Sequence, residues 1–293
     1  MKYDEAYQYG KKILEESLKT VSDDTALCGG SDAARDAKLL LEYVCHTTGS
    51  DLYARPERPL STQEETLYKE VIEKRSEHIP YAYITGETEF MGLPFQVNDD
   101  VLIPRQDTET LVEECMPHLH DGMTFMDLCT GSGCIALSLL RYSNYTTCVA
   151  TDLSEAALHV AERNARQLLL SDRIRFVKTD LFPKREEIAQ GGVDLIVSNP
   201  PYIKSDVIAT LQEEVRDHEP VTALDGGADG MDFYRRIAER APEYLCRGGI
   251  LLVEIGYDQG ESVPALFQHA GFKNVLMIRD LANNARVVSG VYF

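Results

Sequence analysis

Val193-Asp194-Leu195-Ile196-Val197-Ser198-Asn199-Pro200-Pro201-Tyr202 is the stretch around which this sequence is organised. Its apolar run predicts a buried strand that stops at Asn199, because each proline removes a backbone N–H and favours extended backbone before it. The loop Asn199–Tyr202 is therefore expected to be stiff and to lie at the carboxyl end of a strand. In open α/β sheets that edge binds ligands. A plain proline turn would explain one proline but not the flanking asparagine and tyrosine.

Earlier in the chain, residues 124–137 predict a strand, a turn of small residues and a helix. Glycines in the turn let backbone approach a ligand closely, and the helix start offers free N–H groups. The next predicted strand, Val149–Asp152, ends in an acid, and an acid at that place accepts the ribose hydroxyls of a nucleoside. No basic residue stands near the turn to hold a pyrophosphate. A nucleoside without phosphates therefore fits better than a dinucleotide.

The remaining pattern alternates strands with helices. Helices are predicted at Ser154–Leu169 and 259–270, and further strands at Ile174–Asp180, Ile250–Ile255, Val275–Ile278 and Val287–Tyr292. This alternation is typical of an α/β fold with a parallel sheet. The last strand follows its neighbour after a short turn, so we expect it to be antiparallel.

Residues 1–78 are predicted to form a separate helical domain. Apolar residues recur at helical spacing from Tyr3 to Leu18 and again after Ser31-Asp32, a candidate helix cap. Ser61-Thr62-Gln63-Glu64 has the form of a capping box. No reactive constellation is visible, so this region is either a packing domain or a module that recognises a partner.

Residues 79–106 are predicted to be a β-hairpin linker, because the helical period gives way to alternation there. Tyr81–Gly86 and Phe90–Val97 are the two expected strands. Arg105 follows as a candidate to face the active site, with a surface arginine as the competing interpretation. The α/β domain is then expected to occupy residues 107–293.

Composition narrows the function classes. The 293 residues include 44% hydrophobic and 26% charged residues, as in an ordinary globular protein, but the net charge is −19. That charge argues against a protein that grips nucleic acid by its phosphates. The seven cysteines are odd in number and form no C-x-x-C pair, which favours reduced thiols in the cytoplasm over disulfides or a metal site. No signal peptide or membrane-spanning run is visible.

The segment from Thr124 to the C-terminus resembles class I methyltransferases, which use S-adenosylmethionine, a nucleoside without phosphates. Asn199–Tyr202 resembles the signature of their amino-methylating branch. The whole chain is similar to the HemK-type release factor glutamine methyltransferases. The segments that carry this resemblance are Ile79–Gly86, Val101–Arg105, Asn199–Tyr202, Glu219-Pro220, Ala223–Gly230, Phe233–Arg235 and Glu254–Gln259.

The resemblance implies a Rossmann-like, seven-stranded α/β sheet preceded by a helical bundle and a hairpin. It also implies methyl transfer from S-adenosylmethionine to the glutamine amide nitrogen in the Gly-Gly-Gln motif of class I peptide chain release factors, in support of translation termination. Asn199, Pro200 and Tyr202 are then catalytic, and the substrate-binding residues are these three with Pro201 and Arg105. The implied cofactor contacts are Asp127, Cys129, Thr130, Gly131, Ser132, Gly133, Asp152, Leu153, Asp180, Leu181 and Asn199.

The implied chemistry matches the loop. An amide nitrogen is a poor nucleophile because its lone pair is delocalised into the carbonyl. The side-chain oxygen of Asn199 and the carbonyl of Pro200 can accept hydrogen bonds from the substrate NH₂ and hold the nitrogen in line with the methyl group. Tyr202 can stack on the flat amide and exclude water. No general base is expected.

Three positions depart from the family pattern. Cys129 stands where the family usually has glycine, Gln106 where it usually has proline, and Leu181 where an aromatic residue often lies against the adenine. None of them lies in the Asn199–Tyr202 loop.

Two alternatives stay open. An N6-adenine methyltransferase acting on nucleic acid would use the same loop, but the net charge of −19 argues against it. A non-catalytic protein that binds the cofactor would not need Asn199 and Tyr202 together with Asp152. We expect a monomer whose partner is a protein rather than nucleic acid or a membrane, and whose helical domain recognises the substrate.

Overall fold

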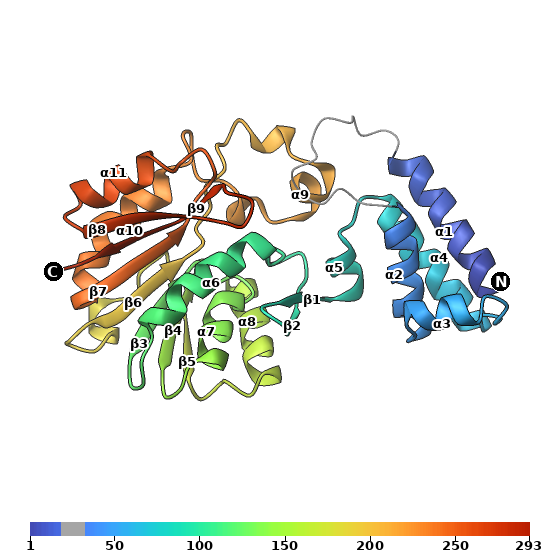
Figure 1. Ribbon diagram of the computed structural model, residues 1–293, viewed down its shortest axis with the longest axis horizontal. Helices are drawn as coiled ribbons and strands as arrows, with labels where there is room; N and C mark the ends of the chain where they lie inside the picture. The colour runs from blue at the N-terminus through green and yellow to red at the C-terminus, as the bar shows by residue number, and fades with distance from the viewer. Residues whose placement is uncertain (19–32) are drawn as a thin grey trace. The chain divides into compact units, whose positions relative to one another are not determined.

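The computed structural model describes residues 1–18 and 33–293 (Figure 1). They form two compact units, Met1–Gly86 and Glu87–Phe293. Each unit has hydrophobic core residues of its own. The boundary lies within the linker predicted at 79–106, and the β-hairpin belongs to the second unit.

The first unit is helical, as the sequence predicts. Its helices are α1 (Tyr3–Leu18), α2 (Ala33–Cys45), α3 (Gly49–Ala54), α4 (Thr62–Ser76) and α5 (Tyr81–Thr85). Ser61 and Glu64 form the predicted capping box at the start of α4, since each side chain accepts the other residue's backbone N–H. The proposed cap Ser31-Asp32 lies outside the described residues.

The strand predicted at Tyr81–Gly86 is wrong, because this segment is α5. Pro80 precedes the helix with a φ that suits a helix start, and Gly86 ends it in the left-handed conformation at φ 78°. Tyr81 and Ile84 both pack against the core of the first unit. Their i, i+3 spacing places them on one helical face, and this packing outweighs the short alternating pattern.

A hairpin is present, but it lies at residues 87–96 and does not pair Tyr81–Gly86 with Phe90–Val97 as predicted. β1 (Glu87–Phe90) pairs antiparallel with β2 (Leu93–Gln96). Met91 and Gly92 connect them, both with positive φ, as a two-residue turn of the type preferred in hairpins requires. After the hairpin come the short helices η1 (Gln106–Thr108), α6 (Glu109–Cys115) and η2 (Met116–His118).

A seven-stranded sheet forms the second unit, in the order β5-β4-β3-β6-β7-β9-β8. β9 is antiparallel to both of its neighbours, which confirms the prediction for the last strand. The strands are β3 (Thr124–Leu128), β4 (Thr147–Asp152), β5 (Ile174–Lys178), β6 (Val193–Ser198), β7 (Leu245–Glu254), β8 (Lys273–Arg279) and β9 (Ala285–Val291).

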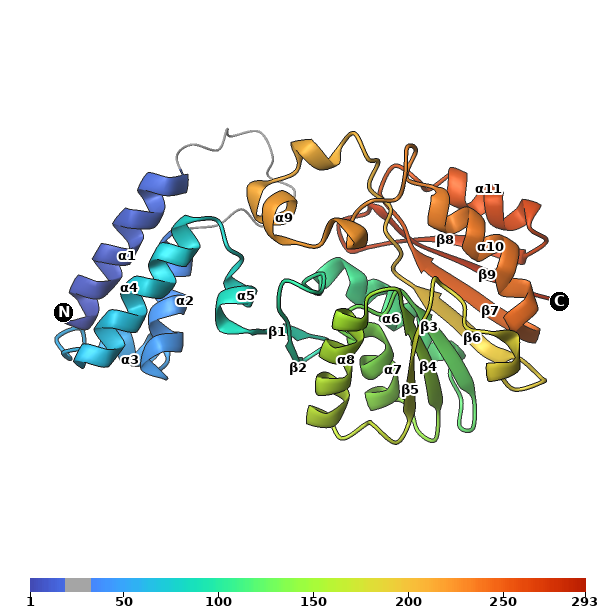
Figure 2. The same ribbon diagram turned by 180° about the vertical axis from the view of Figure 1, so that it is seen from behind.

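Helices cover both faces of this sheet (Figures 1 and 2). One face packs on α10 (Asp232–Tyr244) and α11 (Ser262–His269), and the other on α6, α7 (Cys134–Tyr142) and α8 (Glu155–Gln167). The remaining connections contain η3 (Arg185–Glu187), η4 (Ile208–Thr210), α9 (Glu213–His218) and η5 (Val221–Ala223). Among the described helices, none is long and apolar enough to cross a membrane.

The strand order reverses between β3 and β6. From β3 the chain runs outward to β4 and β5, whereas β6 on its other side leads to β7. In doubly wound sheets a ligand binds at the carboxyl ends of the strands at such a switch point. The turn after β3 and the loop after β6 are therefore the place to look for a site.

Candidate active site

The loops after β3 and β6 start side by side. Leu128 pairs with Ser198 in the parallel ladder, and the Ser198 hydroxyl donates a hydrogen bond of 2.8 Å to the Leu128 carbonyl. The turn that begins at Cys129 and the loop that begins at Asn199 thus leave the sheet from adjacent positions.

The turn after β3 depends on residues in the left-handed conformation. Cys129, Gly131 and Gly133 have φ values of 57°, 55° and 81°. A Cβ added at Gly131 would meet no atom within 4 Å, so there is open space beside the turn, whereas one at Gly133 would press on Ala161 at 3.1 Å. At Cys129 the left-handed conformation costs a non-glycine residue roughly 1–2 kcal/mol, which explains why glycine is usual there in the family that the sequence resembles.

Asp152 ties the end of β4 to this turn. Its two carboxylate oxygens accept backbone N–H groups from Gly131 and Ser154, both at 2.9 Å. Burial raises the pKa of Asp152, and these hydrogen bonds oppose the shift. Each carboxylate oxygen has a second lone pair, so Asp152 can still accept ribose hydroxyls. Leu153, next in the chain, is exposed.

Two buried polar atoms beside the turn lack partners among the described residues. Asp127 is fully buried, and Thr130 Oγ1 donates to its Oδ2 at 2.6 Å, whereas its Oδ1 and the Ser132 hydroxyl have no partner. Buried polar atoms in native proteins are nearly always hydrogen-bonded, so orphaned ones indicate a ligand or solvent site. Together with the open space at Gly131, they fit a ligand that carries its own donors and a positive charge, as S-adenosylmethionine does.

Replacing Asp127 with asparagine is expected to stabilise the cofactor-free protein above pH 7. Burial raises the pKa of Asp127 to about 7, so the folded state holds a proton that the unfolded state releases near pH 4. That contribution to stability is lost as the pH rises through 7. The difference in free energy of unfolding between the variant and wild type should shift by about 2–3 kcal/mol in favour of the variant from pH 5 to pH 8. Denaturant titrations at both pH values measure it, and a difference that stays constant would contradict the burial argument.

Asp180 and Leu181 have different surroundings at the end of β5. The carboxylate of Asp180 is exposed and forms an ion pair of 2.7 Å with Arg236. Leu181, at φ 65°, is buried in the core on the α10 face, and its carbonyl accepts a hydrogen bond from Thr151. The structure thus places Asp180, rather than the side chain of Leu181, at the surface of this strand end.

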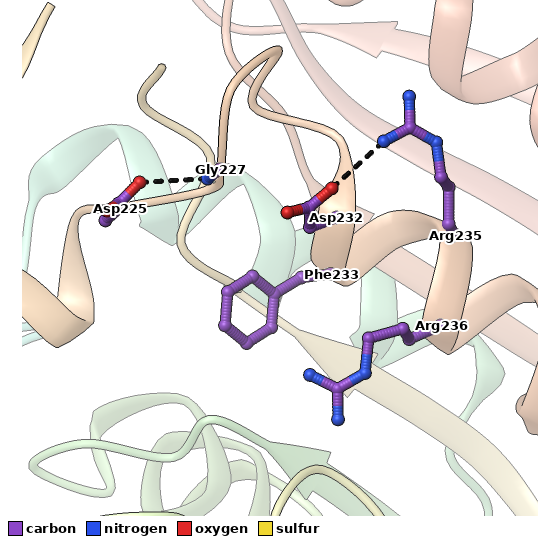
Figure 3. A pocket seen from close by; sticks show the side chains of 6 residues that line it. All are labelled: Asp225, Gly227, Asp232, Phe233, Arg235 and Arg236. Atoms are coloured by element: carbon purple, nitrogen blue, oxygen red, sulfur yellow. Dashed lines mark hydrogen bonds and ion pairs between the residues drawn. The ribbon is translucent and has the colours of Figure 1, made fainter. Parts of the chain in front are cut away.

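A hollow of about 460 Å³ lies beside the start of α10 (Figure 3). Phe233 points into it, with Arg236 on one side and the Asp225–Gly227 loop on another. Because Arg236 also pairs with Asp180, this hollow borders the end of β5. No role was predicted for Phe233 or Arg236, although Phe233–Arg235 is among the segments that carry the resemblance. The residues that line the hollow are Asp225, Gly227, Asp232, Phe233, Arg235 and Arg236.

In the loop after β6, Asn199 is held by a threonine from a distant segment. Its Nδ2 donates to Thr108 Oγ1 at 3.2 Å, and Thr108 is buried. This bond orients the amide group so that the Asn199 side-chain oxygen has no partner among the described residues. The same is true of the Pro200 carbonyl. Both of these oxygens are therefore available as acceptors in this loop.

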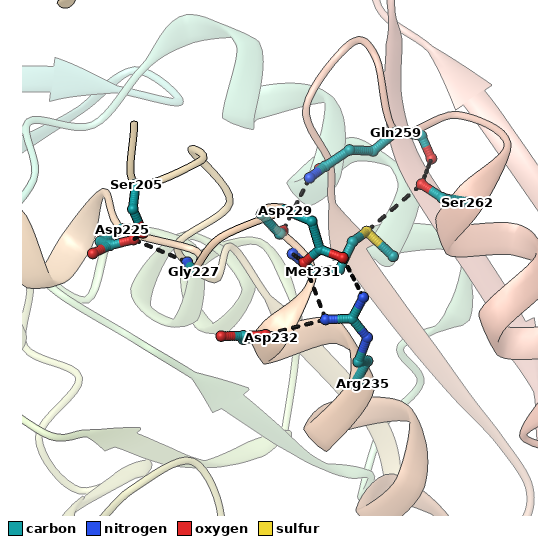
Figure 4. Close-up of polar contacts among 10 residues, drawn as sticks. Ser205, Asp225, Gly227, Asp229, Met231, Asp232, Arg235, Gln259 and Ser262 are labelled. Atoms are coloured by element: carbon teal, nitrogen blue, oxygen red, sulfur yellow. Dashed lines mark hydrogen bonds and ion pairs between the residues drawn. The ribbon is translucent and has the colours of Figure 1, made fainter. Parts of the chain in front are cut away.

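Tyr202 is held at both its ring end and its backbone. Its hydroxyl donates to Glu254 Oε1 at 3.3 Å, and its carbonyl accepts from Gln259 Nε2 at 3.3 Å. Gln259, labelled in Figure 4, is buried and also donates to the Gly230 carbonyl at 3.0 Å. A Cβ at Gly226 would lie 2.7 Å from the Tyr202 Cα. The glycine-rich segment 226–230 thus packs directly against the backbone of Tyr202.

Arg105 contacts a carboxylate rather than standing alone. It forms an ion pair with Glu219, which is buried at the end of α9. Burial raises the pKa of Glu219, and the charge of Arg105 opposes this shift. The geometry gives Arg105 a role in fastening the segment after the hairpin to α9.

Sequence reasoning missed three residues of this site: Thr108, Glu254 and Gln259. Each is a buried polar residue that contacts the Asn199–Tyr202 loop. The segment Glu254–Gln259 was noted only for its resemblance. For Glu254 a signal was available in the sequence, because this acid directly follows the apolar run Ile250–Val253 and so ends a strand at the same edge of the sheet as Asn199.

Comparisons with known proteins find matches to both parts of the chain. Residues 5–86 match the family model of the PrmC N-terminal domain, and residues 106–217 match that of the methyltransferase small domain. A release factor glutamine methyltransferase of Agrobacterium fabrum is 38% identical over 89% of this chain and 91% of its own length. One of Cereibacter sphaeroides is 39% identical over 94% and 96%. The crystal structure of a methyltransferase from Pyrococcus furiosus shares the fold, with a TM-score of 0.52 and 17% identity over 69% of this chain and 90% of that one.

Proposed function

The chain belongs to the release factor glutamine methyltransferase family, and on that premise we propose that the Asn199–Tyr202 loop binds the glutamine side chain that receives the methyl group. The enzyme transfers a methyl group from S-adenosylmethionine to the side-chain amide nitrogen of the glutamine in the Gly-Gly-Gln motif of peptide chain release factors. It is thus a protein-(glutamine-N5) methyltransferase that supports translation termination. The relatives favour this reaction over the methylation of adenine.

The observation that carries this proposal is the hydrogen bond from Asn199 Nδ2 to Thr108 Oγ1. It leaves the Asn199 side-chain oxygen free to accept, beside the Pro200 carbonyl, and a substrate NH₂ group has two N–H donors for these oxygens. Accepting both N–H groups orients the nitrogen lone pair toward the methyl donor and stabilises the positive charge that develops on nitrogen. Tyr202 covers the flat amide and excludes water.

S-adenosylmethionine supplies a methyl group activated by its positively charged sulfur. The residues that would hold it are those of the turn after β3 and the acids at the ends of β4 and β5. Asp127, with its orphaned oxygen, and Ser132 suit the amino acid part, whereas Asp152 suits the ribose hydroxyls. Gly131 leaves room for close approach. Cys129, Thr130, Gly133, Leu153, Asp180 and Leu181 are the other proposed contacts.

Replacing Asp152 with alanine is expected to weaken S-adenosylhomocysteine binding by roughly 1.5–3 kcal/mol, the value of a hydrogen bond to a charged group. Because Asp152 also anchors Gly131, the 2′-deoxy analogue of the ligand separates the two roles. Calorimetric titration should show that the 2′-deoxy analogue binds wild type weakly. Its affinity for Asp152→Ala should be only slightly lower than its affinity for wild type. Unchanged affinity in Asp152→Ala would mean that Asp152 serves only the turn.

The test of the reaction itself uses labelled S-adenosylmethionine. Label should enter an intact release factor and should be absent from the same factor with its motif glutamine changed to alanine. Label that enters a nucleic acid instead would favour the alternative function, N6-methylation of adenine. The net charge of −19 supports a protein partner without direct nucleic acid contact. The cysteines of the described residues are free, which supports a cytoplasmic location. We also propose that the protein is a monomer.

A further inference from the structure

Glu254 is a buried acid next to the proposed active-site loop. It is the last residue of β7, and its neighbour Val253 pairs with Ser198, the residue before Asn199. Only 2% of Glu254 is exposed. Acids are almost never buried to this degree unless they are paired.

The usual partner of a buried acid is missing here. Among the described residues, no cation lies within ion-pair distance of Glu254. The nearby Arg286 is paired instead with Asp107 at 2.8 Å and Asp280 at 3.0 Å. Glu254 Oε2 has no hydrogen-bond partner in the part of the chain that the structure describes, and burial raises the pKa of this carboxyl to about 7. Such a group destabilises the fold, and groups of this kind are concentrated at functional sites.

Tyr202 donates its hydroxyl to Glu254 Oε1 at 3.3 Å, and the Thr108 hydroxyl also lies against this carboxylate. The backbone of Tyr202 is already fixed by Gln259 and by the packing of Gly226. The ring itself packs against the core on the α10 face, and its far end is held by the Glu254 carboxylate.

We propose that Glu254 is a positioning residue for methyl transfer, whose carboxylate holds the Tyr202 hydroxyl and so fixes the ring that covers the glutamine amide. This inference rests on the proposed role of the Asn199–Tyr202 loop. It predicts that Glu254 and Tyr202 act as one unit, so that losing either member of the hydrogen bond has the same consequence as losing both.

A double-mutant cycle with Tyr202→Phe and Glu254→Leu tests the inference. Each single change should lower kcat on an intact release factor about tenfold, and the double change should also lower it about tenfold rather than about 100-fold. The KM for the release factor and the affinity for S-adenosylhomocysteine should stay within about twofold. Glu254→Gln keeps an oxygen that can accept the hydroxyl, so it should recover most of the lost turnover.

Tyr234→Phe is the matched control. Tyr234 is also fully buried, but its hydroxyl donates to the backbone carbonyl of Glu254 at 2.9 Å instead of the side chain. Removing the Tyr234 hydroxyl should lower the free energy of unfolding. Its effect on kcat should be the same in the wild-type background as in the Glu254→Leu background. The inference is overturned if the kcat losses of Tyr202→Phe and Glu254→Leu multiply in the double variant. It is also overturned if Glu254→Gln turns over as slowly as Glu254→Leu.

If Glu254→Leu does not fold, the pH dependence of Glu254→Gln decides. At saturating cofactor, wild-type kcat should rise only about twofold through pH 7, because protonated Glu254 keeps an acceptor oxygen and the ionised form accepts more strongly; the glutamine variant should lack this rise. A rise that persists in the variant overturns the inference. The titratable and charged groups that face Glu254 are Tyr202, Tyr234, Cys134, Asp107 and Arg286, the last of which is paired with Asp280.

The proposed loop can fail separately. If Asn199→Ala and Tyr202→Phe both turn over at the wild-type rate, the role of the loop is wrong, and the inference falls with it. If Asn199→Ala is nearly inactive while the effects of Tyr202 and Glu254 multiply, only the positioning role is wrong.

Discussion

Replacing Asn199 with alanine is expected to lower kcat by about 10²–10³-fold, by analogy with the loss of one group that stabilises transition-state charge. The change removes the oxygen that accepts from the substrate amide. It also removes the Nδ2 donor that is bonded to Thr108. Affinity for S-adenosylhomocysteine should stay close to that of wild type, because the turn after β3 and Asp152 are untouched. Turnover on a release factor and calorimetric titration measure the two quantities.

Thr108→Val provides the graded control for this prediction. It keeps the shape of the buried side chain but removes the hydroxyl that orients the Asn199 amide. Turnover should fall about tenfold, since the Asn199 oxygen is still present but less firmly directed. Near-wild-type turnover in Asn199→Ala would show that the loop binds the substrate without Asn199. An equal loss in both variants would mean that only the orientation matters.

Removing the helical unit is expected to have the second large effect. A fragment of residues 87–293 should lose about 100-fold or more in kcat/KM on the intact release factor, which corresponds to about 3 kcal/mol of remote binding energy. On a short Gly-Gly-Gln peptide the loss should be only a few fold. A glutamine amide is chemically undistinguished, so selection of one glutamine needs contacts away from the reacting atom. Residues 1–86 carry no reactive group of the proposed site and are available for that purpose.

The fragment is a fair test because each unit has its own core. The core of the first unit is built from residues up to Ile84, and those of the second from Phe90 onward. A melting curve and a titration with S-adenosylhomocysteine must show that the fragment folds and binds before rates are compared. If this folded fragment methylates the intact factor as well as the full chain does, the helical unit only stabilises the enzyme.

Much of the fold follows from patterns that span a few residues. Apolar runs such as Leu195–Val197 mark buried strands, and their alternation with helices selects a parallel sheet. The hairpin turn at Met91-Gly92 is not predicted, because the pattern places both residues inside the expected strand Phe90–Val97. The sequence predicts a strand at Tyr81–Gly86, because so short a segment does not separate an alternating pattern from one helical turn. The packing of Tyr81 and Ile84 against the core of the first unit favours the helix α5 over a strand.

The Asn-Pro-Pro-Tyr loop and the glycine turn can be predicted from the sequence, because their backbone conformation depends on the residues in them. Two prolines fix their own backbone, and glycines at 131 and 133 permit left-handed conformations whatever surrounds them. The acid Asp152 could be placed from its position at a strand end. These are the parts of the site that the sequence by itself determined.

The tertiary structure alone decided how that loop is held. Thr108 and Asn199 are 91 residues apart, and Tyr202 and Glu254 are 52 apart, yet the strand order brings both pairs to one edge of the sheet. It also leaves Asp127 and Glu254 buried with unpaired oxygens, which raises the pKa of each to about 7. Hydrogen-bond partners and desolvation depend on which segments become neighbours in space. No local sequence pattern specifies those neighbours, because they are set by the packing of the whole sheet and its helices.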